Sequence, residues 1–290
     1  MLTIGRPDLR LDPYPYVVKD GFVEQDLFDQ LSAAFPSDEL FKSNKKNEWG
    51  GGRINLVRGM PTFMDFIESS PPWRKFYDYM NSEAFVRLVV DLFGEHIVKL
   101  GGQLDTSNWA YSDYVEPLWR CGAAKKTAYE YYMQRFKVDS TRDKIFNLFQ
   151  KDQLYTTFDL ASADSGYHIP VHTDNRNKIA IMLLYFSDLG SSEYSGGDLI
   201  IHRHRTETDQ RRFPRYPGEE NTEGVLTLKP KKNLGIISLN CNNSYHSTTP
   251  FKTTGETRKF LYVAVAKRHV DNAWACEAVE NRTADARGVA

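Results

Sequence analysis

The sequence has few cysteines and no excess of charge of either sign. Its three cysteines, Cys121, Cys241 and Cys276, are far apart and form no C-x-x-C pair, which predicts neither a disulfide framework nor a thiolate zinc site. The 37 basic and 38 acidic residues give a formal net charge of −1, so the chain offers no electrostatic footprint for a polyanion. We therefore expect a small-molecule partner rather than a nucleic acid or an anionic membrane.

Long apolar runs are also missing. No stretch approaches the roughly 20 apolar residues that span a bilayer, and the opening MLTIGRPDLRLDPYPYVVKDG does not have the basic start and apolar centre of a signal peptide. With the low use of cysteine, this predicts a cytoplasmic protein. The composition is that of a globular chain, with 41% hydrophobic and 13% aromatic residues, enough to fill one large core. We expect a single domain over residues 1–290.

The first half of that domain, about residues 1–150, is expected to be mostly helical support. YPYVVKDGFV predicts a strand that enters a turn, whereas EQDLFDQLSAAF and SEAFVRLVVDLFGEHIV carry apolar residues at helical spacing. Ser82 is a plausible cap of the second helix. The segment KSNKKNEWGGGRINL between them predicts a mobile loop, which could serve as a lid. Aromatic residues between Lys125 and Lys151 predict core packing.

The second half, about residues 151–270, changes character. Short β-rich segments follow one another with turn residues between them: LYTTFDL, KIAIMLLYF, GGDLIIH, GVLTLK, NLGIISL and KFLYVAVA. Strands in this order, without helical patterns between them, favour an antiparallel sandwich or barrel of the jelly-roll kind. The expected fold class is therefore mainly β with flanking helices (α+β).

Three side chains are candidate metal ligands. His172 and Asp174 lie two residues apart next to a predicted strand, and residues i and i+2 of an extended chain point to the same side. His246 follows the predicted strand NLGIISL, and jelly-roll topology can return it to the same place. Two imidazoles and one carboxylate leave three positions open, which suits an iron(II) ion that binds a bidentate co-substrate and dioxygen.

A fourth candidate, Arg258, opens the next predicted strand, ETRKFLYVAVA. A guanidinium can bind a carboxylate by two parallel hydrogen bonds. It could thus anchor the far end of a dicarboxylate that chelates the metal with its near end. Lys259 should face the other side of the strand, so we favour Arg258.

These parts occur in a characteristic order: H-x-D at His172, KIAIMLLYF, GGDLII, PKKNLGIIS, His246 and RKFLY at Arg258. In that order the chain resembles the 2-oxoglutarate- and iron(II)-dependent oxygenases, especially their prolyl-4-hydroxylase-like branch, over roughly residues 150–268 and in its opening. The resemblance implies a double-stranded β-helix (jelly-roll, cupin-like) core, with iron(II), 2-oxoglutarate and dioxygen, and ascorbate as an optional reductant. It also implies hydroxylation of an unactivated C–H bond of a small molecule or an amino-acid- or peptide-like substrate, with release of succinate and carbon dioxide.

One departure concerns the co-substrate. Many relatives in other branches carry a serine two residues after the arginine, where this chain has Phe260. We therefore expect the carboxylate on Arg258 to find a second partner in a residue such as Tyr185 or Tyr155. Related halogenases carry a small residue at the position of Asp174, which disfavours halogenation here, while desaturation, ring formation and epimerisation stay open.

Other patterns receive plainer interpretations. His202 and His204 alternate with arginines in DLIIHRHR and predict a solvated strand end. The polar insert from Arg203 to Gly224 carries five arginines among several acids and predicts a solvated loop rather than an anion site. Two other functions stay open: a non-catalytic jelly-roll module that binds sugar or protein, and a cupin-type metalloenzyme that does not use 2-oxoglutarate. The sequence identifies neither the substrate nor the oligomeric state.

Overall fold

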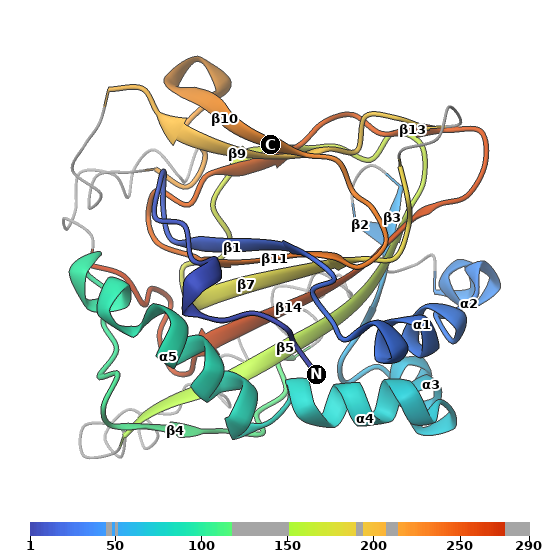
Figure 1. Ribbon diagram of the computed structural model, residues 1–290, viewed down its shortest axis with the longest axis horizontal. Helices are drawn as coiled ribbons and strands as arrows, with labels where there is room; N and C mark the ends of the chain where they lie inside the picture. Colours follow the sequence, from blue (N-terminus) through green and yellow to red (C-terminus); the bar gives the residue numbers. More distant parts are fainter. Residues whose placement is uncertain (45–47, 50–51, 118–150, 190–193, 207–213, 276–290) are drawn as a thin grey trace, which may run out of the picture.

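The computed structural model describes residues 1–44, 48–49, 52–117, 151–189, 194–206 and 214–275. These residues form an eight-stranded sheet, a four-stranded sheet and five α-helices. Figure 1 shows the helices along one side of the larger sheet, with strands of the smaller sheet on its other side. The fold class predicted from the sequence, mainly β with flanking helices, is confirmed.

The larger sheet has the order β1-β11-β7-β14-β5-β3-β2, with β4 beside β5. Its strands are β1 (Tyr16–Asp20), β2 (Glu48–Trp49), β3 (Arg53–Val57), β4 (Trp109–Tyr111), β5 (Asp152–Ala163), β7 (Lys178–Tyr185), β11 (Leu234–Leu239) and β14 (Arg258–Lys267). The smaller sheet has the order β10-β9-β12-β6. Its strands are β6 (Ile169–His172), β9 (Leu199–His204), β10 (Thr222–Leu228) and β12 (His246–Thr248). The short strands β8 (Tyr194–Ser195) and β13 (Lys252–Thr253) pair with each other.

The chain alternates between the two sheets from β5 onward. It passes from β5 in the larger sheet to β6 in the smaller one, back to β7, across to β9 and β10, and then through β11, β12 and β14 in the same alternation. The pairs among these strands are antiparallel. This winding is that of a jelly roll, which confirms the predicted double-stranded β-helix and brings distant segments together.

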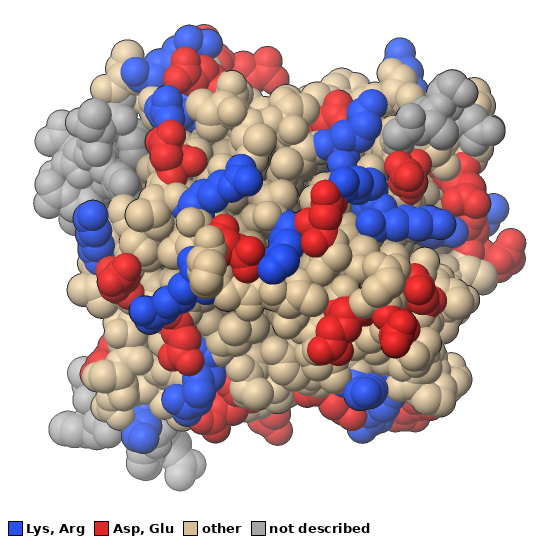
Figure 2. Space-filling view, in the orientation of Figure 1, with Lys and Arg blue, Asp and Glu red and all other residues tan. Residues whose placement is uncertain are grey.

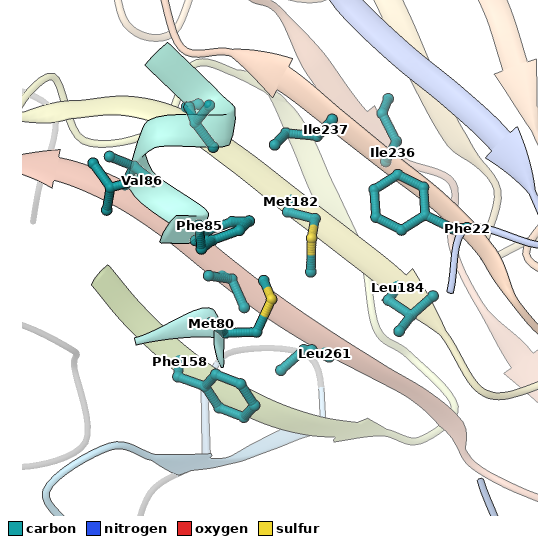
Figure 3. Close-up of a cluster of buried hydrophobic side chains, with 14 of the residues drawn as sticks. Phe22, Met80, Phe85, Val86, Phe158, Met182, Leu184, Ile236, Ile237 and Leu261 are labelled. Atoms are coloured by element: carbon teal, nitrogen blue, oxygen red, sulfur yellow. The ribbon is translucent and has the colours of Figure 1, made fainter. Parts of the chain in front are cut away.

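The helices cover the outer face of the larger sheet. They are α1 (Gln25–Ala33), α2 (Asp38–Ser43), α3 (Pro61–Ser69), α4 (Pro71–Met80) and α5 (Glu83–Lys99). The Ser82 hydroxyl accepts a hydrogen bond from the Phe85 N–H at the start of α5, as predicted for a cap. Figure 3 shows side chains of α5 and the end of α4 lying over β7, β14 and β5.

Strand alternation gives the larger sheet two different faces. On β14, Leu261 and Val263 join the core beneath the helices, whereas Phe260 and Tyr262 line a cavity on the opposite face. Residues directly opposite each other in the ladder share a face. The whole sheet therefore has one face towards the helices and one face towards the cavity. The outer face supplies stability, and the inner face is free to carry polar groups.

One sequence-based expectation about the first half needs correction. The residues RINL, which we expected in a mobile loop, form β3, paired with β5 from Arg53 opposite Ala163 to Val57 opposite Asp159. The alternation of polar and apolar residues suits a half-buried strand, and the edge of β5 supplies backbone partners. Gly50, Gly51, the stretch 125–150, Cys121 and Cys276 lie outside the described residues.

The surface is mixed in charge. In the face shown in Figure 2, lysine and arginine side chains are interspersed with aspartate and glutamate, as a net charge of −1 would suggest. Within the described ranges, no helix has the length and hydropathy needed to cross a membrane.

Candidate metal centre and cavity

The fold brings the three candidate ligands together. His172 ends β6 and His246 begins β12, and the two residues are direct partners in the antiparallel ladder. Their ring centroids are 4.4 Å apart. Asp174 follows two residues after His172, and one ligand atom from each residue lies within 4.8 Å of the others. Neighbouring strands of the smaller sheet thus place all three at one point.

Backbone carbonyls orient both imidazoles. His172 Nδ1 lies 2.8 Å from the Pro170 carbonyl oxygen, and His246 Nδ1 lies 3.0 Å from that of Ser244. Because a carbonyl oxygen only accepts, each Nδ1 must carry the proton, which leaves Nε2 with a lone pair. Burial, followed by the proximity of His246, lowers the pKa of His172 to about 4. A neutral imidazole with a tied Nδ1–H is the usual form of a metal-binding histidine.

The carboxylate of Asp174 is held from one side. Its Oδ2 accepts a hydrogen bond from the Tyr262 hydroxyl, and Lys178 Nζ lies 3.8 Å from the same oxygen. Its Oδ1 lies 3.8 Å from His172 Nε2. Burial by itself would raise the pKa of Asp174, but Lys178, the two histidines and the Tyr262 hydroxyl outweigh burial and lower it. An ionised carboxylate therefore presents one oxygen to the space between the imidazoles.

This donor set fits a divalent transition metal. Two imidazole nitrogens and one carboxylate oxygen on one side of an ion are the ligands of non-haem iron(II) oxygenases, which keep the remaining positions for reactants. A closed structural zinc site needs a fourth protein ligand, and among the described residues the cluster contains only His172, Asp174 and His246. The residues fit a reactive iron(II) better than a structural metal.

A cavity of about 360 Å³ opens beside the cluster, a size suited to a small ligand. Its wall consists of Arg53, Asn55, Asp159, Tyr167, Ile169, Pro170, His172, Asp174, Lys178, Arg215, Tyr216, Phe260 and Tyr262. Eight of these thirteen residues lie on β3, β5, β6 and β14. The cluster therefore forms part of a concave site rather than a flat surface.

Arg258 is a buried cation beside this cavity. Arg258 is only 2% exposed. Its guanidinium carbon lies 4.7 Å from the ring centroid of Phe260 and 5.2 Å from those of Tyr167 and Tyr185. Within the described part of the chain it forms no ion pair, and its Nε has no hydrogen-bond partner. A buried charge is costly without a counter-ion, so this arrangement favours an anionic ligand.

The two tyrosines predicted to bind the co-substrate carboxylate together with Arg258 lie in different parts of the sheet. Tyr185 accepts a hydrogen bond from Arg258 Nη2 at 3.4 Å, and burial raises the pKa of Tyr185 to about 12, so it keeps its hydroxyl proton. Tyr155 lies opposite Ala266, whereas Arg258 lies opposite Ala163. At about 3.3 Å per residue, these positions are roughly 26 Å apart along β5.

We therefore correct the prediction that Tyr155 contacts the co-substrate carboxylate expected at Arg258. Its hydroxyl instead accepts a hydrogen bond from Asn177 Nδ2 at 3.0 Å and donates one to Glu116. His202 also differs from expectation, because it is 8% exposed rather than solvated. Its Nε2 lies 2.7 Å from Ser247 Oγ.

Sequence reasoning missed several residues of the cavity wall. Tyr262 had a usable signal, because it follows Arg258 by an even number of residues and so shares its face of β14. No sequence signal identified Asn55 and Asp159, since these residues come together only through the pairing of β3 with β5. Arg215 lines the cavity although its segment was expected to be a solvated loop.

Comparisons with known proteins give structural likenesses only. No protein-family model and no curated protein sequence matches the chain. A prolyl 4-hydroxylase from Phytophthora capsici is similar in structure at 13% identity and a TM-score of 0.44, over 94% of this chain and 66% of that one. A prolyl-4-hydroxylase from Pseudomonas putida has 10% identity and a TM-score of 0.40, over 87% of this chain and 92% of that one.

A third solved structure, an oxidoreductase of the 2OG-Fe(II) oxygenase family from Burkholderia pseudomallei, is 11% identical with a TM-score of 0.37, over 88% of this chain and 94% of that one. These proteins bear the names of the family that the ordered motifs resemble. Identities and TM-scores of this size do not carry a function from one protein to another, so the activity has to be inferred from the site itself.

Proposed function

We propose that the chain is an iron(II)- and 2-oxoglutarate-dependent oxygenase. It would hydroxylate a C–H bond of a small molecule or an amino-acid- or peptide-like substrate and release succinate and carbon dioxide. The observation that carries the proposal is the convergence of His172, Asp174 and His246 at a cavity of about 360 Å³. Dioxygen as co-substrate and ascorbate as an optional reductant belong to the same proposal.

The three residues of the cluster would hold iron through His172 Nε2, His246 Nε2 and one oxygen of Asp174. When bound, iron(II) would supply the activation of dioxygen together with 2-oxoglutarate. The chain has to keep the remaining coordination positions free. Tyr262 contributes to this, because its hydrogen bond to Asp174 Oδ2 disfavours a carboxylate that binds the ion with both oxygens.

Arg258 and Tyr185 would bind the far carboxylate of 2-oxoglutarate. A guanidinium with a free Nε edge can form two parallel hydrogen bonds to a carboxylate, and the protonated Tyr185 hydroxyl can donate another. Arg258 and Tyr262 lie on the same face of β14, four residues and roughly 13 Å apart. A dicarboxylate lying along this face would reach from the cluster towards Arg258, which supports its role as anchor.

Apolar side chains around the site would limit the entry of water. Tyr167 and Phe260 pack around Arg258, and Ile169 and Tyr216 line the cavity nearer the cluster. A low-dielectric wall strengthens the interaction of Arg258 with a ligand carboxylate. It also protects reactive species from side reactions with solvent.

An anaerobic titration tests this proposal. Addition of iron(II) and then 2-oxoglutarate to the purified protein should produce a visible metal-to-ligand charge-transfer band, and Arg258→Gln should raise the 2-oxoglutarate concentration needed for it. Arg74→Gln, on the exposed face of α4, is the matched control and should leave the titration unchanged.

The same titration separates the other candidate functions. A non-catalytic binding module would give no band, and a metalloenzyme without 2-oxoglutarate chemistry would bind iron(II) without responding to the co-substrate. Either result would contradict the proposal.

A further inference from the structure

Two polar side chains form an unused patch on the cavity wall. Asn55 on β3 lies opposite Ala161 of β5, two residues from Asp159, so both side chains occupy the inner face of the sheet. Asp159 in turn lies opposite Tyr262 on β14, whose hydroxyl binds Asp174. The patch is thus one strand away from a residue that touches the metal cluster, and both of its members line the cavity.

Each side chain has a buried oxygen without a hydrogen-bond partner among the described residues. Asn55 is 4% exposed, and its Oδ1 is buried without a hydrogen-bond partner. Asp159 Oδ1 is likewise buried without a hydrogen-bond partner. Buried polar atoms are normally satisfied, because leaving one without a partner costs about 1–3 kcal/mol. Two such groups side by side at a cavity indicate that a ligand satisfies them.

The electrostatics point to a positively charged ligand group. Burial raises the pKa of Asp159 to about 7, although Lys178 and Arg53 both lower it. The cations of the protein therefore do not compensate this carboxylate fully. A neutral donor would leave the charge of Asp159 buried and uncompensated, whereas an ammonium would supply both hydrogen bonds and the counter-charge.

A cation suited to a ligand anion lies on the same wall. Arg53 is two residues from Asn55 and shares its face of β3. Its Nη1 donates to the Tyr167 hydroxyl at 3.3 Å, and its guanidinium carbon lies 5.6 Å from the Tyr167 ring centroid, which holds the group beside the cavity. Arg258 lies across β5 from Arg53, since Ala163 is the ladder partner of both residues, so two carboxylates could be bound at separate places.

We propose that Asn55 and Asp159 bind the ammonium group of the substrate and that Arg53 binds its carboxylate, so that the substrate is a free amino acid. This subsite rests on the proposed function, in which Arg258 is occupied by 2-oxoglutarate. The substrate then completes the hydrogen bonding of the wall and lies beside the metal cluster. Removal of the positive charge from the substrate amine should abolish recognition.

The twenty standard L-amino acids, each paired with its N-acetyl derivative, are the probes. Each is added anaerobically to protein loaded with iron(II) and 2-oxoglutarate, and binding is measured by perturbation of the charge-transfer band and by the thermal unfolding midpoint. We expect at least one amino acid to bind and its N-acetyl derivative to fail. That amino acid should also raise the rate of succinate formation in air.

Asp159→Asn keeps the shape of the side chain and removes its charge. It should weaken binding of that amino acid roughly ten- to hundred-fold, the size expected for a lost charge-assisted hydrogen bond, while the iron and 2-oxoglutarate titrations stay unchanged. Its unfolding midpoint should equal or exceed that of the wild type, because a buried charge without a partner is removed. Asp20→Asn, at an exposed ion pair with Lys231, is the matched control and should bind as the wild type does.

The outcomes separate the two proposals. Equal binding of the N-acetyl derivative, unchanged affinity in Asp159→Asn, or no response to any of the twenty amino acids would overturn the subsite, while an intact band would leave the oxygenase proposal standing. Absence of the band in the wild type would overturn the oxygenase proposal and this subsite with it.

Discussion

The Tyr262 hydroxyl should control how tightly the protein binds its metal. It donates to Asp174 Oδ2 and accepts a hydrogen bond from Lys178 Nζ at 2.6 Å. Tyr262→Phe removes both bonds and leaves the packing of the ring unchanged. Asp174 would then be free to rotate, and the oxygen that faces the two imidazoles would no longer be fixed.

Two independent magnitudes bound the effect. A hydrogen bond to a charged group contributes about 1.5–3 kcal/mol, and loss of a residue that orients a metal ligand typically lowers metal affinity about 10- to 100-fold. At about 1.4 kcal/mol for each factor of ten, the two ranges agree. Lys178 already lies 3.8 Å from Asp174 Oδ2 and can replace part of the lost bond. We therefore expect a roughly ten-fold loss.

Anaerobic titration calorimetry with iron(II) measures this directly. Tyr79→Phe is the control, because Tyr79 on α4 lies in the helical layer outside the cavity, and this substitution should leave the dissociation constant as it is in the wild type. The reasoning would be refuted by a dissociation constant for Tyr262→Phe within two-fold of the wild type, or by an equal loss in the control.

Three further predictions address the ligand, the pH dependence and the core. Arg258→Gln should weaken 2-oxoglutarate binding by about 2–5 kcal/mol and Arg258→Lys by less, in titrations of the charge-transfer band; equal losses would argue against two parallel hydrogen bonds. The folded-state pKa of Asp159, about 7, lies above its ordinary 3.8, so the folded state holds the proton more tightly between these values. The contribution of Asp159 to the free energy of unfolding of chelator-treated protein should therefore fall as pH rises through this window, by at most about 4 kcal/mol. Because the lowered pKa of His172 gives the opposite slope over part of the window, urea denaturation should compare the wild type with Asp159→Asn, and the difference between their free energies of unfolding should show the fall. Phe158→Ala should cost about 3–5 kcal/mol by urea denaturation, because Phe158 is fully buried among aromatic rings, whereas the exposed Leu11→Ala should change stability by less than about 0.5 kcal/mol.

Much of the fold is readable in the sequence because its two periodicities are clear. β7 is an almost continuous apolar run, since one of its faces packs under the helices and the other faces the inside of the jelly roll. β3 was missed because its five residues follow a glycine run and include Arg53 and Asn55, whose polarity makes sense only beside a cavity. A polar strand face has no signal until its surroundings are known. The expected single domain and cytoplasmic location stay predictions.

Some residues of the candidate site could be predicted from the sequence, and others could not. His172 and Asp174 could be found because their relation is local and follows from the two-residue period of a strand. The sequence could not show that Tyr185 lies near Arg258 and Tyr155 far from it. Both are aromatic residues in apolar strands, and only the register of β5 and β7 against β14 separates their positions. Asn55 and Asp159 meet through a pairing of distant segments, which no local pattern specifies.

The first strand of the chain, β1, covers β11, which would otherwise be the edge strand of the larger sheet. β1 pairs with five of the six residues of β11, from Leu234 to Ser238, and all six residues of β11 are buried. Without residues 1–20, the β11 backbone would present open donors and acceptors on an apolar strand, the arrangement through which sheets of separate molecules join. Shortening the protein at this end should therefore produce self-association before it produces any loss of metal binding.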